Sequence, residues 1–479
     1  MKKILSMLLV LTSIFVLVGC GKDKKKNISE YEVKSIAELK ETDVEVTFRH
    51  PFGQAITVVI EELIESFNEE YPNITIKLDP IGGYDPMKEA TVYDINGGIA
   101  PTMIVGYPDH FAEYLITDSI ITLDAFINAE DPEIALKDEI DDFLPGYLAE
   151  NRLFDADKSF RGLPFNKSTE VMFYNSDFFK EFNLTVPKTW AEYEAVSKTI
   201  LEKVATIKDG QYSWLGNIET NLDNGEFLPG MYDSTGNLFT TLIHQFDGSY
   251  TKSYFLASGA TDVQSGELSF VTDAKAKEAL TYMQTLANKE YINTPEVWEG
   301  QYGSGYFSNG QVLMNIGSSA GSTHYNAAKS NWEVAPIPYK DEDHKFVIQQ
   351  GTNVAIFSQA TDLEKLAAWM FIKHCLTPEN TATFAIKTGY MPVRKSAYEL
   401  EVYKNFLDPA KRTPAQIGTS KVHNAATEYT KDGWNYFVDA AWSGSSKLRK
   451  EVGTAVVEIL INKVAVSKAF ENAKNRYGA

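Results

Sequence analysis

The sequence predicts an α/β fold built from more than one domain. Three observations support this prediction. The chain has 479 residues, 44% of its residues are hydrophobic and 23% are charged, and strand and helix patterns alternate along it. A chain of this length exceeds the usual size of one domain and suits two or three. The composition is that of a globular protein with a buried core.

The first twenty residues differ from the rest. Lys2 and Lys3 precede an apolar run at residues 4–18, which is too short to span a membrane comfortably and matches a signal-peptide core. The run ends at Gly19-Cys20, which resembles a bacterial lipobox whose cysteine carries lipid. We therefore expect a lipoprotein signal peptide over residues 1–19 and a lipid-anchored tether over residues 20–43. The alternative is a simple signal peptide that ends near a cysteine.

The first folded segments alternate between strand and helix. Val44, Val46 and Phe48 alternate with polar residues, which predicts a strand near the start of the folded part. Apolar residues with helical spacing come next. The four segments that follow the first strand are predicted as helix, strand, helix and strand, at residues 56–67, 74–78, 86–96 and 102–105. This order is typical of helices that cover a mainly parallel sheet.

The later part of the chain repeats this pattern. Predicted strands lie at residues 171–174, 312–316 and 354–357, and predicted helices lie at residues 190–204, 272–288 and 363–376. Thr189 is the expected N-cap of the first of these helices, and Thr272 or Asp273 that of the second.

Charge and cysteine content exclude some classes of protein. The formal net charge of −20 comes without the basic face that duplex binding requires, so we expect no nucleic-acid partner. Cys20 and Cys375 are the only cysteines. If Cys20 carries lipid, Cys375 has no partner for an intrachain disulfide. Cys375 lies in an apolar helical stretch, and we expect a buried, inert thiol.

The sequence lacks the motifs of the common hydrolases. The seven histidines are scattered, and there is no HExxH motif, no Gly-x-Ser-x-Gly elbow and no P-loop. We therefore predict no catalytic residue, no metal site and no cofactor. A secreted hydrolase that acts on glycans or phosphodiesters is the alternative from another class, and a surface adhesin is a third.

Short motifs spread along the chain resemble those of the extracellular solute-binding proteins of carbohydrate-type ABC importers. The motifs are Tyr71-Pro72-Asn73-Ile74, Ala100-Pro101, Leu163-Pro164-Phe165-Asn166, Pro187-Lys188-Thr189-Trp190, Phe307-Ser308-Asn309-Gly310-Gln311 and Thr388-Gly389-Tyr390-Met391-Pro392-Val393. Each motif is weakly specific, but together they occur in the family's order over nearly all of the chain after the tether.

The resemblance implies a two-lobed periplasmic-binding-protein-like fold of type II, with a hinge and a central ligand cleft. We place lobe 1 at residues 44–160 plus 337–386, and lobe 2 at residues 161–336 plus 387–479.

Within this family, the similarity is greatest to members that bind glycerol 3-phosphate or glycerophosphodiesters. The resemblance implies ligand contacts at Tyr84, Ser168, Ser318, Gly351, Tyr390 and Arg449. Asp109 stands near the position of a family glutamate and is a shorter carboxylate.

The chemistry of these residue types suits a phosphorylated polyol. An arginine fork pairs with phosphate, and serines and N–H groups at helix starts bind anions. Ser318 precedes a predicted helix over residues 321–329. The two serines as helix caps, Gly351 as a turn and Arg449 in a surface ion pair are the plainer alternatives.

The function implied by the resemblance is that of a monomeric substrate-binding lipoprotein at the outer face of the cytoplasmic membrane. It would bind a small polar solute, a phosphorylated glycerol or a sugar, and deliver it to ABC permease and ATPase subunits. Binding of sn-glycerol 3-phosphate or glycerophosphodiesters is the first hypothesis. The same fold and role with a neutral sugar or oligosaccharide is the nearest alternative.

Overall fold

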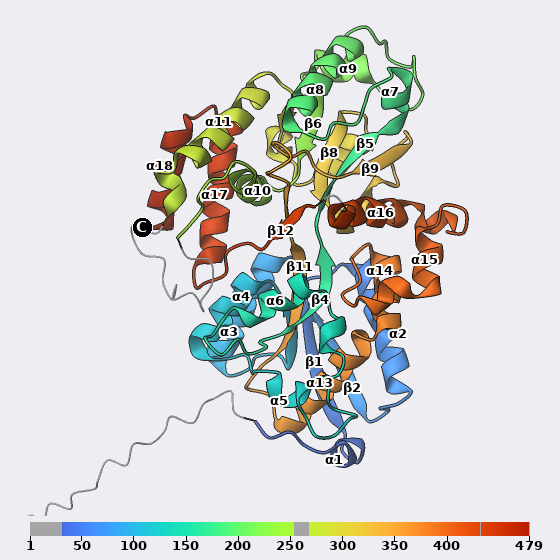
Figure 1. Cartoon of the computed structure of the whole chain (residues 1–479), viewed down its shortest axis with the longest axis vertical. Coiled ribbons are helices and arrows are strands. Elements are labelled where there is room, and N and C mark those ends of the chain that lie inside the picture. Colours follow the sequence, from blue (N-terminus) through green and yellow to red (C-terminus); the bar gives the residue numbers. More distant parts are fainter. Residues whose placement is uncertain (1–30, 253–267, 432, 479) are drawn as a thin grey trace, which may run out of the picture.

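The computed structural model describes residues 31–252, 268–431 and 433–478 (Figure 1). Two five-stranded sheets form two lobes, with strand orders β2-β1-β3-β11-β4 and β7-β6-β8-β5-β9. Figure 1 shows the lobe with β1 and β2 below the lobe with β5 and β6. The predicted two-lobed α/β fold is confirmed. The predicted signal peptide and Cys20 lie outside the described residues.

The sheet of lobe 1 combines parallel and antiparallel strands. β1 pairs in parallel with β2 and β3, whereas β11 runs antiparallel to β3 and β4. The parallel part matches the prediction, and the reversed strand comes from a segment that returns from lobe 2. The strands are β1 (Val44–His50), β2 (Ile74–Pro80), β3 (Met103–Gly106), β4 (Leu163–Ser168) and β11 (Gln350–Ile356).

Helices of lobe 1 cover this sheet and close its core. Val46 and Phe48 of β1 are fully buried in a cluster that also contains Ile60 and Phe371 from two helices. The helices are α1 (Ile36–Lys40), α2 (Gln54–Asn68), α3 (Tyr84–Gly97), α4 (Pro108–Tyr114), α5 (Asp124–Ile127), α6 (Pro145–Ala149), α13 (Asp362–Cys375), α14 (Pro378–Thr388) and α15 (Glu401–Leu407). Cys375 is buried and free, as predicted.

Lobe 2 holds the second sheet and a separate core. Its strands are β5 (Glu170–Asn175), β6 (Leu228–Tyr232), β7 (Ile292–Asn293), β8 (Val312–Ser318) and β9 (Trp332–Ala335). Its helices are α7 (Ser176–Glu181), α8 (Trp190–Val204), α9 (Ile218–Asp223), α10 (Thr235–Gln245), α11 (Ala274–Asn288), α12 (Gly303–Ser308), α16 (Ile417–Lys431), α17 (Ser445–Leu460) and α18 (Val466–Tyr477). Thr189 forms a capping box with Glu192, and Asp273 caps α11.

The chain passes between the two sheets at several points. β4 leads through Thr169 directly into β5. Two short strands, β10 (Phe346–Ile348) and β12 (Asn435–Phe437), pair in parallel beside these crossings. Thr169 Oγ1 donates to the Ile348 carbonyl at 2.8 Å. This hydrogen bond joins the crossing between β4 and β5 to the return crossing between β10 and β11.

The structure moves some of the predicted boundaries. β4 pairs with β11, so the chain leaves lobe 1 at Thr169 rather than at residue 161. Ile337 and Tyr339 belong to the core of lobe 2, and Tyr390 and Val393 to that of lobe 1. The predicted boundaries at residues 337 and 387 therefore both fall too early. Strand periodicity locates an element, but only its pairing partner decides the lobe.

Two further local predictions are corrected. The predicted tether over residues 20–43 includes α1, whose Ile36 and Leu39 are buried in the lobe 1 core because this short helix is amphipathic. The helix predicted over residues 321–329 is a 3₁₀ helix, Ser319–Tyr325, with Ser318 as its N-cap.

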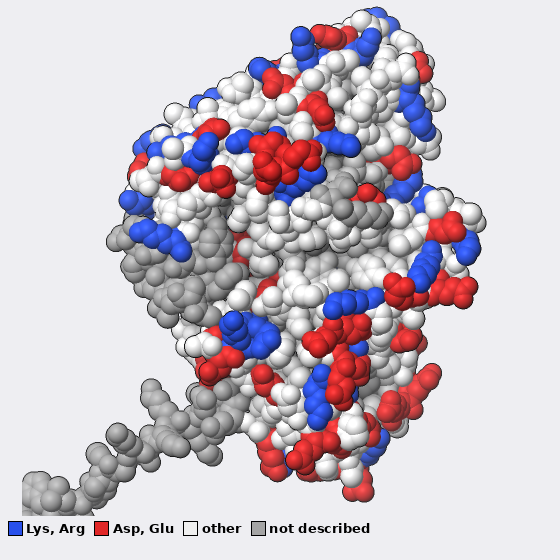
Figure 2. All heavy atoms as spheres, viewed as in Figure 1, with Lys and Arg blue, Asp and Glu red and all other residues white. Residues whose placement is uncertain are grey.

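Two properties bear on the surroundings of the protein. Within the described ranges, no helix combines the length and the apolar character that a membrane span needs. Figure 2 shows Asp and Glu interspersed with Lys and Arg over both lobes on the face in view. This arrangement differs from the continuous basic face that nucleic-acid duplexes require.

Candidate ligand-binding site

A cavity of about 980 Å³ lies between the lobes, with walls from both. Six of the seven predicted ligand contacts line it: Tyr84, Asp109, Ser318, Gly351, Tyr390 and Arg449. The seventh, Ser168, is buried at the end of β4 opposite Gln350 and is not among the lining residues. Segments far apart in the sequence therefore meet at one cavity.

Tyrosine rings form the lobe 1 wall. Tyr84 begins α3 after Gly83, whose φ of 85° favours glycine. The Tyr84 and Tyr107 rings meet edge to face, with centroids 4.9 Å apart. Burial raises the pKa of Tyr84, Tyr107 and Tyr390, so the hydroxyls remain protonated at neutral pH. The wall thus offers flat apolar surface with hydroxyl tips, which suits a polyol or sugar.

Gly351 lies where a side chain has no room. Its φ is 88°, and a Cβ atom there would lie 2.0 Å from the Asn166 carbonyl oxygen of the neighbouring strand. The strand pairing shifts register between Thr352 and Asn353, one residue further on. The backbone of Gly351 is therefore held at the cavity wall without a side chain.

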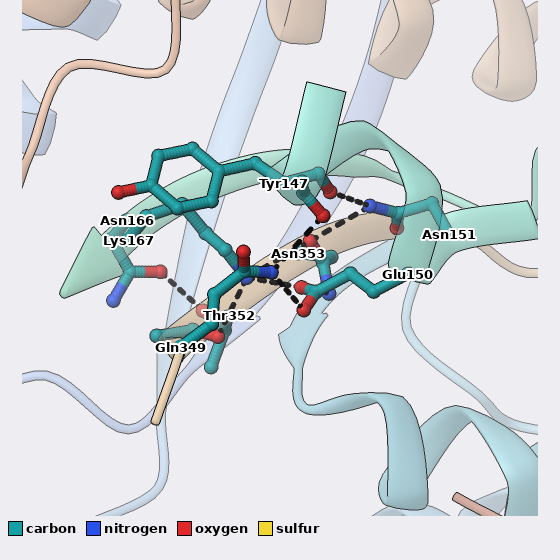
Figure 3. Close-up of polar contacts among 10 residues, drawn as sticks. Tyr147, Glu150, Asn151, Asn166, Lys167, Gln349, Thr352 and Asn353 are labelled. Atoms are coloured by element: carbon teal, nitrogen blue, oxygen red, sulfur yellow. Dashed lines mark hydrogen bonds and ion pairs between the residues drawn. The ribbon is translucent and has the colours of Figure 1, made fainter. Parts of the chain in front are cut away.

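A buried polar network supports this part of the wall (Figure 3). Lys167 forms an ion pair with Glu150 and donates to the Gly351 carbonyl at 2.9 Å. Gln349 and Asn353 donate to the two Glu150 carboxylate oxygens at 2.6 and 2.7 Å. Burial lowers the pKa of Lys167, and the Glu150 carboxylate opposes that effect. The network fixes the position of the Gly351 backbone.

Arg449 is held on the opposite wall by two side chains. It lies on α17, forms an ion pair with Asp439 and donates to the Asn237 side-chain oxygen. A Cβ on Gly236 would lie 3.3 Å from Arg449 Cγ, so glycine at this position gives the arginine room against the start of α10. The guanidinium group therefore reaches the cavity already paired with one carboxylate.

Two more lobe 2 carboxylates face the cavity. Glu170 accepts hydrogen bonds from Tyr232 Oη at 2.5 Å and Asn237 Nδ2 at 2.8 Å, and burial raises its pKa to about 7. Asp233 accepts from the Gly303 N–H at 2.7 Å, and burial raises its pKa to about 6. Within the part of the chain that the structure describes, neither carboxylate forms an ion pair. Both can accept hydroxyl or ammonium hydrogens from a ligand.

The remaining predicted residues have simpler surroundings. Ser318 Oγ accepts from the Ala320 N–H at 3.3 Å, which is the helix-cap role. Asp109 lies half-buried at the start of α4. Trp214, Trp298 and Trp434, which are also aromatic candidates for such a cleft, are not among the lining residues and pack against hydrophobic clusters.

Sequence reasoning missed Tyr107, Glu170, Asp233, Asn237 and Asp439, all of which line the cavity. One signal was available for Asp233, which directly follows β6, because ligands of parallel sheets gather at the carboxyl ends of strands. Another was available for Glu170, a single carboxylate before the apolar run Val171-Met172-Phe173. Buried carboxylates of this kind require a partner or a ligand.

The described residues contain no group of three or more His, Cys, Asp or Glu side chains placed to hold a metal ion. The cavity combines the Arg449 guanidinium group, several carboxyl groups and aromatic surface, which is the composition of a site for a small polar molecule.

Comparison with known proteins gives consistent results. Residues 62–413 match the family of bacterial extracellular solute-binding proteins. The sn-glycerol-3-phosphate-binding periplasmic protein UgpB of Pectobacterium atrosepticum is 26% identical over 400 residues, which cover 79% of this chain and 80% of the relative. UgpB of Yersinia enterocolitica is 26% identical over 399 residues, covering 81% and 82%.

Solved structures share the fold at lower identity. UgpB from Mycobacterium tuberculosis in complex with glycerophosphocholine has a TM-score of 0.70 and 17% identity, covering 90% of this chain and 97% of that one. An ABC substrate-binding protein from Listeria monocytogenes in complex with cycloalternan has a TM-score of 0.69 and 16% identity, covering 91% and 98%. Similarity at this level shows the fold alone.

Proposed function

The chain belongs to the bacterial extracellular solute-binding proteins, and we propose that it captures a glycerophosphate for an ABC importer. The candidates are sn-glycerol 3-phosphate and its diesters. The observation that carries this proposal is Arg449 on the wall of the cavity, opposite Tyr84 and Tyr390. A planar guanidinium group suits phosphate, and the tyrosines suit the glycerol part.

The similarity to UgpB proteins supports the same ligand class, since the curated relatives are named for sn-glycerol 3-phosphate binding. The size of the cavity favours a larger member of the class. Its volume of about 980 Å³ is close to the upper end of the range of roughly 300 to 1,000 Å³ for small-molecule sites. A glycerophosphodiester fills such a cavity better than glycerol 3-phosphate does.

A neutral sugar or oligosaccharide is the second candidate. Glu170 and Asp233 have no cationic partner among the described residues, and carboxylates of this kind accept sugar hydroxyls. The solved neighbours include sugar complexes, among them the cycloalternan complex. In this case the tyrosine wall carries the affinity and Arg449 contributes little.

Titration calorimetry and thermal unfolding with purified protein test the proposal. The ligands are glycerol 3-phosphate, glycerophosphocholine, maltose and monosaccharides. A ligand at 100 times its Kd adds about 2.7 kcal/mol to the free energy of unfolding. We expect the phosphorylated glycerols to stabilise the wild type and Arg449→Ala to lose most of that effect. If sugars alone stabilise the protein, the ligand is a sugar and the proposed phosphate ligand is wrong.

The cellular setting is part of the proposal. The protein is a lipoprotein anchored through Cys20 at the outer face of the membrane, and it delivers the solute to permease and ATPase subunits as a monomer. It releases the ligand unchanged, because its role is binding rather than turnover. Mass spectrometry of the N-terminal peptide, with Cys20→Ala as the control, tests the anchor. Recovery of intact glycerophosphocholine after incubation tests the absence of turnover.

A further inference from the structure

Asp439 already forms an ion pair with Arg449, the cation that the proposed phosphate ligand needs. Arg449 is half-buried, its side chain 31% exposed, and it forms an ion pair with Asp439, whose side chain is 21% exposed. Asp439 Oδ1 also accepts from the Ala440 N–H at 2.8 Å, which fixes its carboxylate. Both residues line the cavity. A phosphate that reaches Arg449 therefore shares the guanidinium group with a fixed negative charge.

The wider charge balance at this wall is negative. Asn237 bridges Arg449 and Glu170, because its amide oxygen accepts from the arginine and its amide nitrogen donates to the carboxylate. Asp233 lies on the same cavity. Glu170, Asp233, Glu296 and Asp439 thus place four carboxyl groups on the lobe 2 wall around one guanidinium group. Lys450, the other lysine or arginine on the wall, is exposed, so solvent screens its charge.

We propose that Asp439 is a specificity-determining residue that limits the negative charge of the bound phosphate. It favours monoanionic glycerophosphodiesters over the dianionic monoester glycerol 3-phosphate. The inference rests on the proposed function, since it concerns the phosphate site. It deepens that function by assigning the diester as the preferred substrate class.

The physical reason is the extra charge of a monoester. A phosphate monoester carries about −1.5 to −2 at neutral pH because its second pKa is about 6, whereas a diester carries a single charge. The second charge interacts unfavourably with Asp439 at the distance of a shared ion pair. In a partly buried site, removing one such repulsion changes affinity by roughly tenfold or more.

The test compares two ligands across matched variants. Calorimetry at pH 8, where the monoester is dianionic, gives the Kd of glycerol 3-phosphate and of glycerophosphocholine. We expect Asp439→Asn to lower the ratio of the glycerol 3-phosphate Kd to the glycerophosphocholine Kd by about tenfold. Asp439→Glu keeps the charge and should keep the wild-type ratio.

Glu451→Gln is the control for net charge. Glu451 lies on α17, the helix of Arg449, pairs with Arg476 and is not among the lining residues, so its substitution should leave the ratio unchanged. Thermal unfolding confirms that each variant is folded. If Asp439→Asn does not fold, Asp439→Ser serves as a second neutral variant.

Other outcomes overturn the proposal in distinguishable ways. If Asp439→Asn weakens both ligands equally, Asp439 only positions Arg449, and the proposed function stands without this inference. The same conclusion follows if the ratio changes equally in Glu451→Gln. If the wild type binds sugars and neither phosphorylated glycerol, the phosphate function falls and this inference falls with it.

Discussion

Two clusters in this protein combine carboxylates with a single cation, and their surroundings differ. At the first crossing between lobes, Lys167 and Glu150 are fully buried and joined by Gln349 and Asn353 (Figure 3). At the cavity, Arg449 and Asp439 remain partly exposed. The first cluster has one carboxylate for its cation and the second has two or more.

This difference separates structural from binding roles. A buried pair whose hydrogen bonds are satisfied is costly to break, because removal of one partner leaves an uncompensated buried charge. A cluster that is open to a cavity and has more carboxylates than cations leaves acceptors for a ligand. We therefore expect substitutions of the buried Lys167–Glu150 pair to change mainly stability, and substitutions of the partly exposed Arg449–Asp439 pair to change mainly affinity.

The largest effect is expected for Lys167→Met. It removes the cation beside Glu150 and the donor to the Gly351 carbonyl. The free energy of unfolding should fall by about 3 to 5 kcal/mol, measured by urea denaturation. Addition of Glu150→Gln to this variant should recover part of the loss. If the free energy of unfolding falls by less than about 1 kcal/mol, the network is not structural, and the two clusters do not differ in role.

Glu170 should give the next largest effect, seen as a pH dependence. Burial raises its folded-state pKa from 4.5 to about 7, so its contribution to stability is present at low pH and is lost as pH rises through 7. Between pH 5 and 8, wild type should lose about 2 to 3 kcal/mol relative to Glu170→Gln. Buried histidines titrate in both proteins and cancel in the difference. Parallel stability curves would contradict the prediction.

Arg449→Ala should separate affinity from stability. Loss of charged hydrogen bonds to a phosphate costs about 1.5 to 3 kcal/mol, which is roughly 10-fold to 150-fold in Kd. Because the side chain is partly exposed, the free energy of unfolding without ligand should change by about 1 kcal/mol or less. Calorimetry with glycerophosphocholine and urea denaturation measure the two quantities. A large stability loss without change in Kd would reverse the assigned roles.

The smallest effect is expected for an exposed ion pair, which sets the baseline. Lys275 and Glu278 pair on the surface of α11, at 51% and 49% exposure. Lys275→Ala should leave the urea denaturation curve unchanged within error, because solvent screens an exposed pair. A change comparable to that of Lys167→Met would mean that burial does not distinguish the clusters.

Much of the local structure could be predicted from the sequence. The predicted helix at residues 190–204 coincides with α8, and its predicted N-cap, Thr189, is confirmed. The strand patterns at Val44 and at residues 74–78 match β1 and β2. Apolar periodicity and capping side chains act over a few residues, so they can be read without knowledge of the fold.

The site was predicted less evenly. Six predicted residues line the cavity. They could be predicted because the order of motifs indicated the fold, and the fold places the loops that hold them. The pairing of Arg449 with Asp439 and the bridge through Asn237 to Glu170 were not predictable. The bridge through Asn237 joins β5, α10 and α17, which are separated by long stretches of chain, and Asp439 lies in the loop before α17, whose path past Arg449 depends on the fold.

The sequence by itself determined the alternation of strands and helices and the helix caps, because each depends on neighbours within a turn or a strand, whereas the candidate residues came from the order of motifs that resembles the family. The tertiary structure decided that β4 belongs to lobe 1, that Ser168 lies off the cavity wall, and that Arg449 is already paired. Charge and burial at a site are properties of residues brought together from distant segments. They are fixed only when those segments pack together.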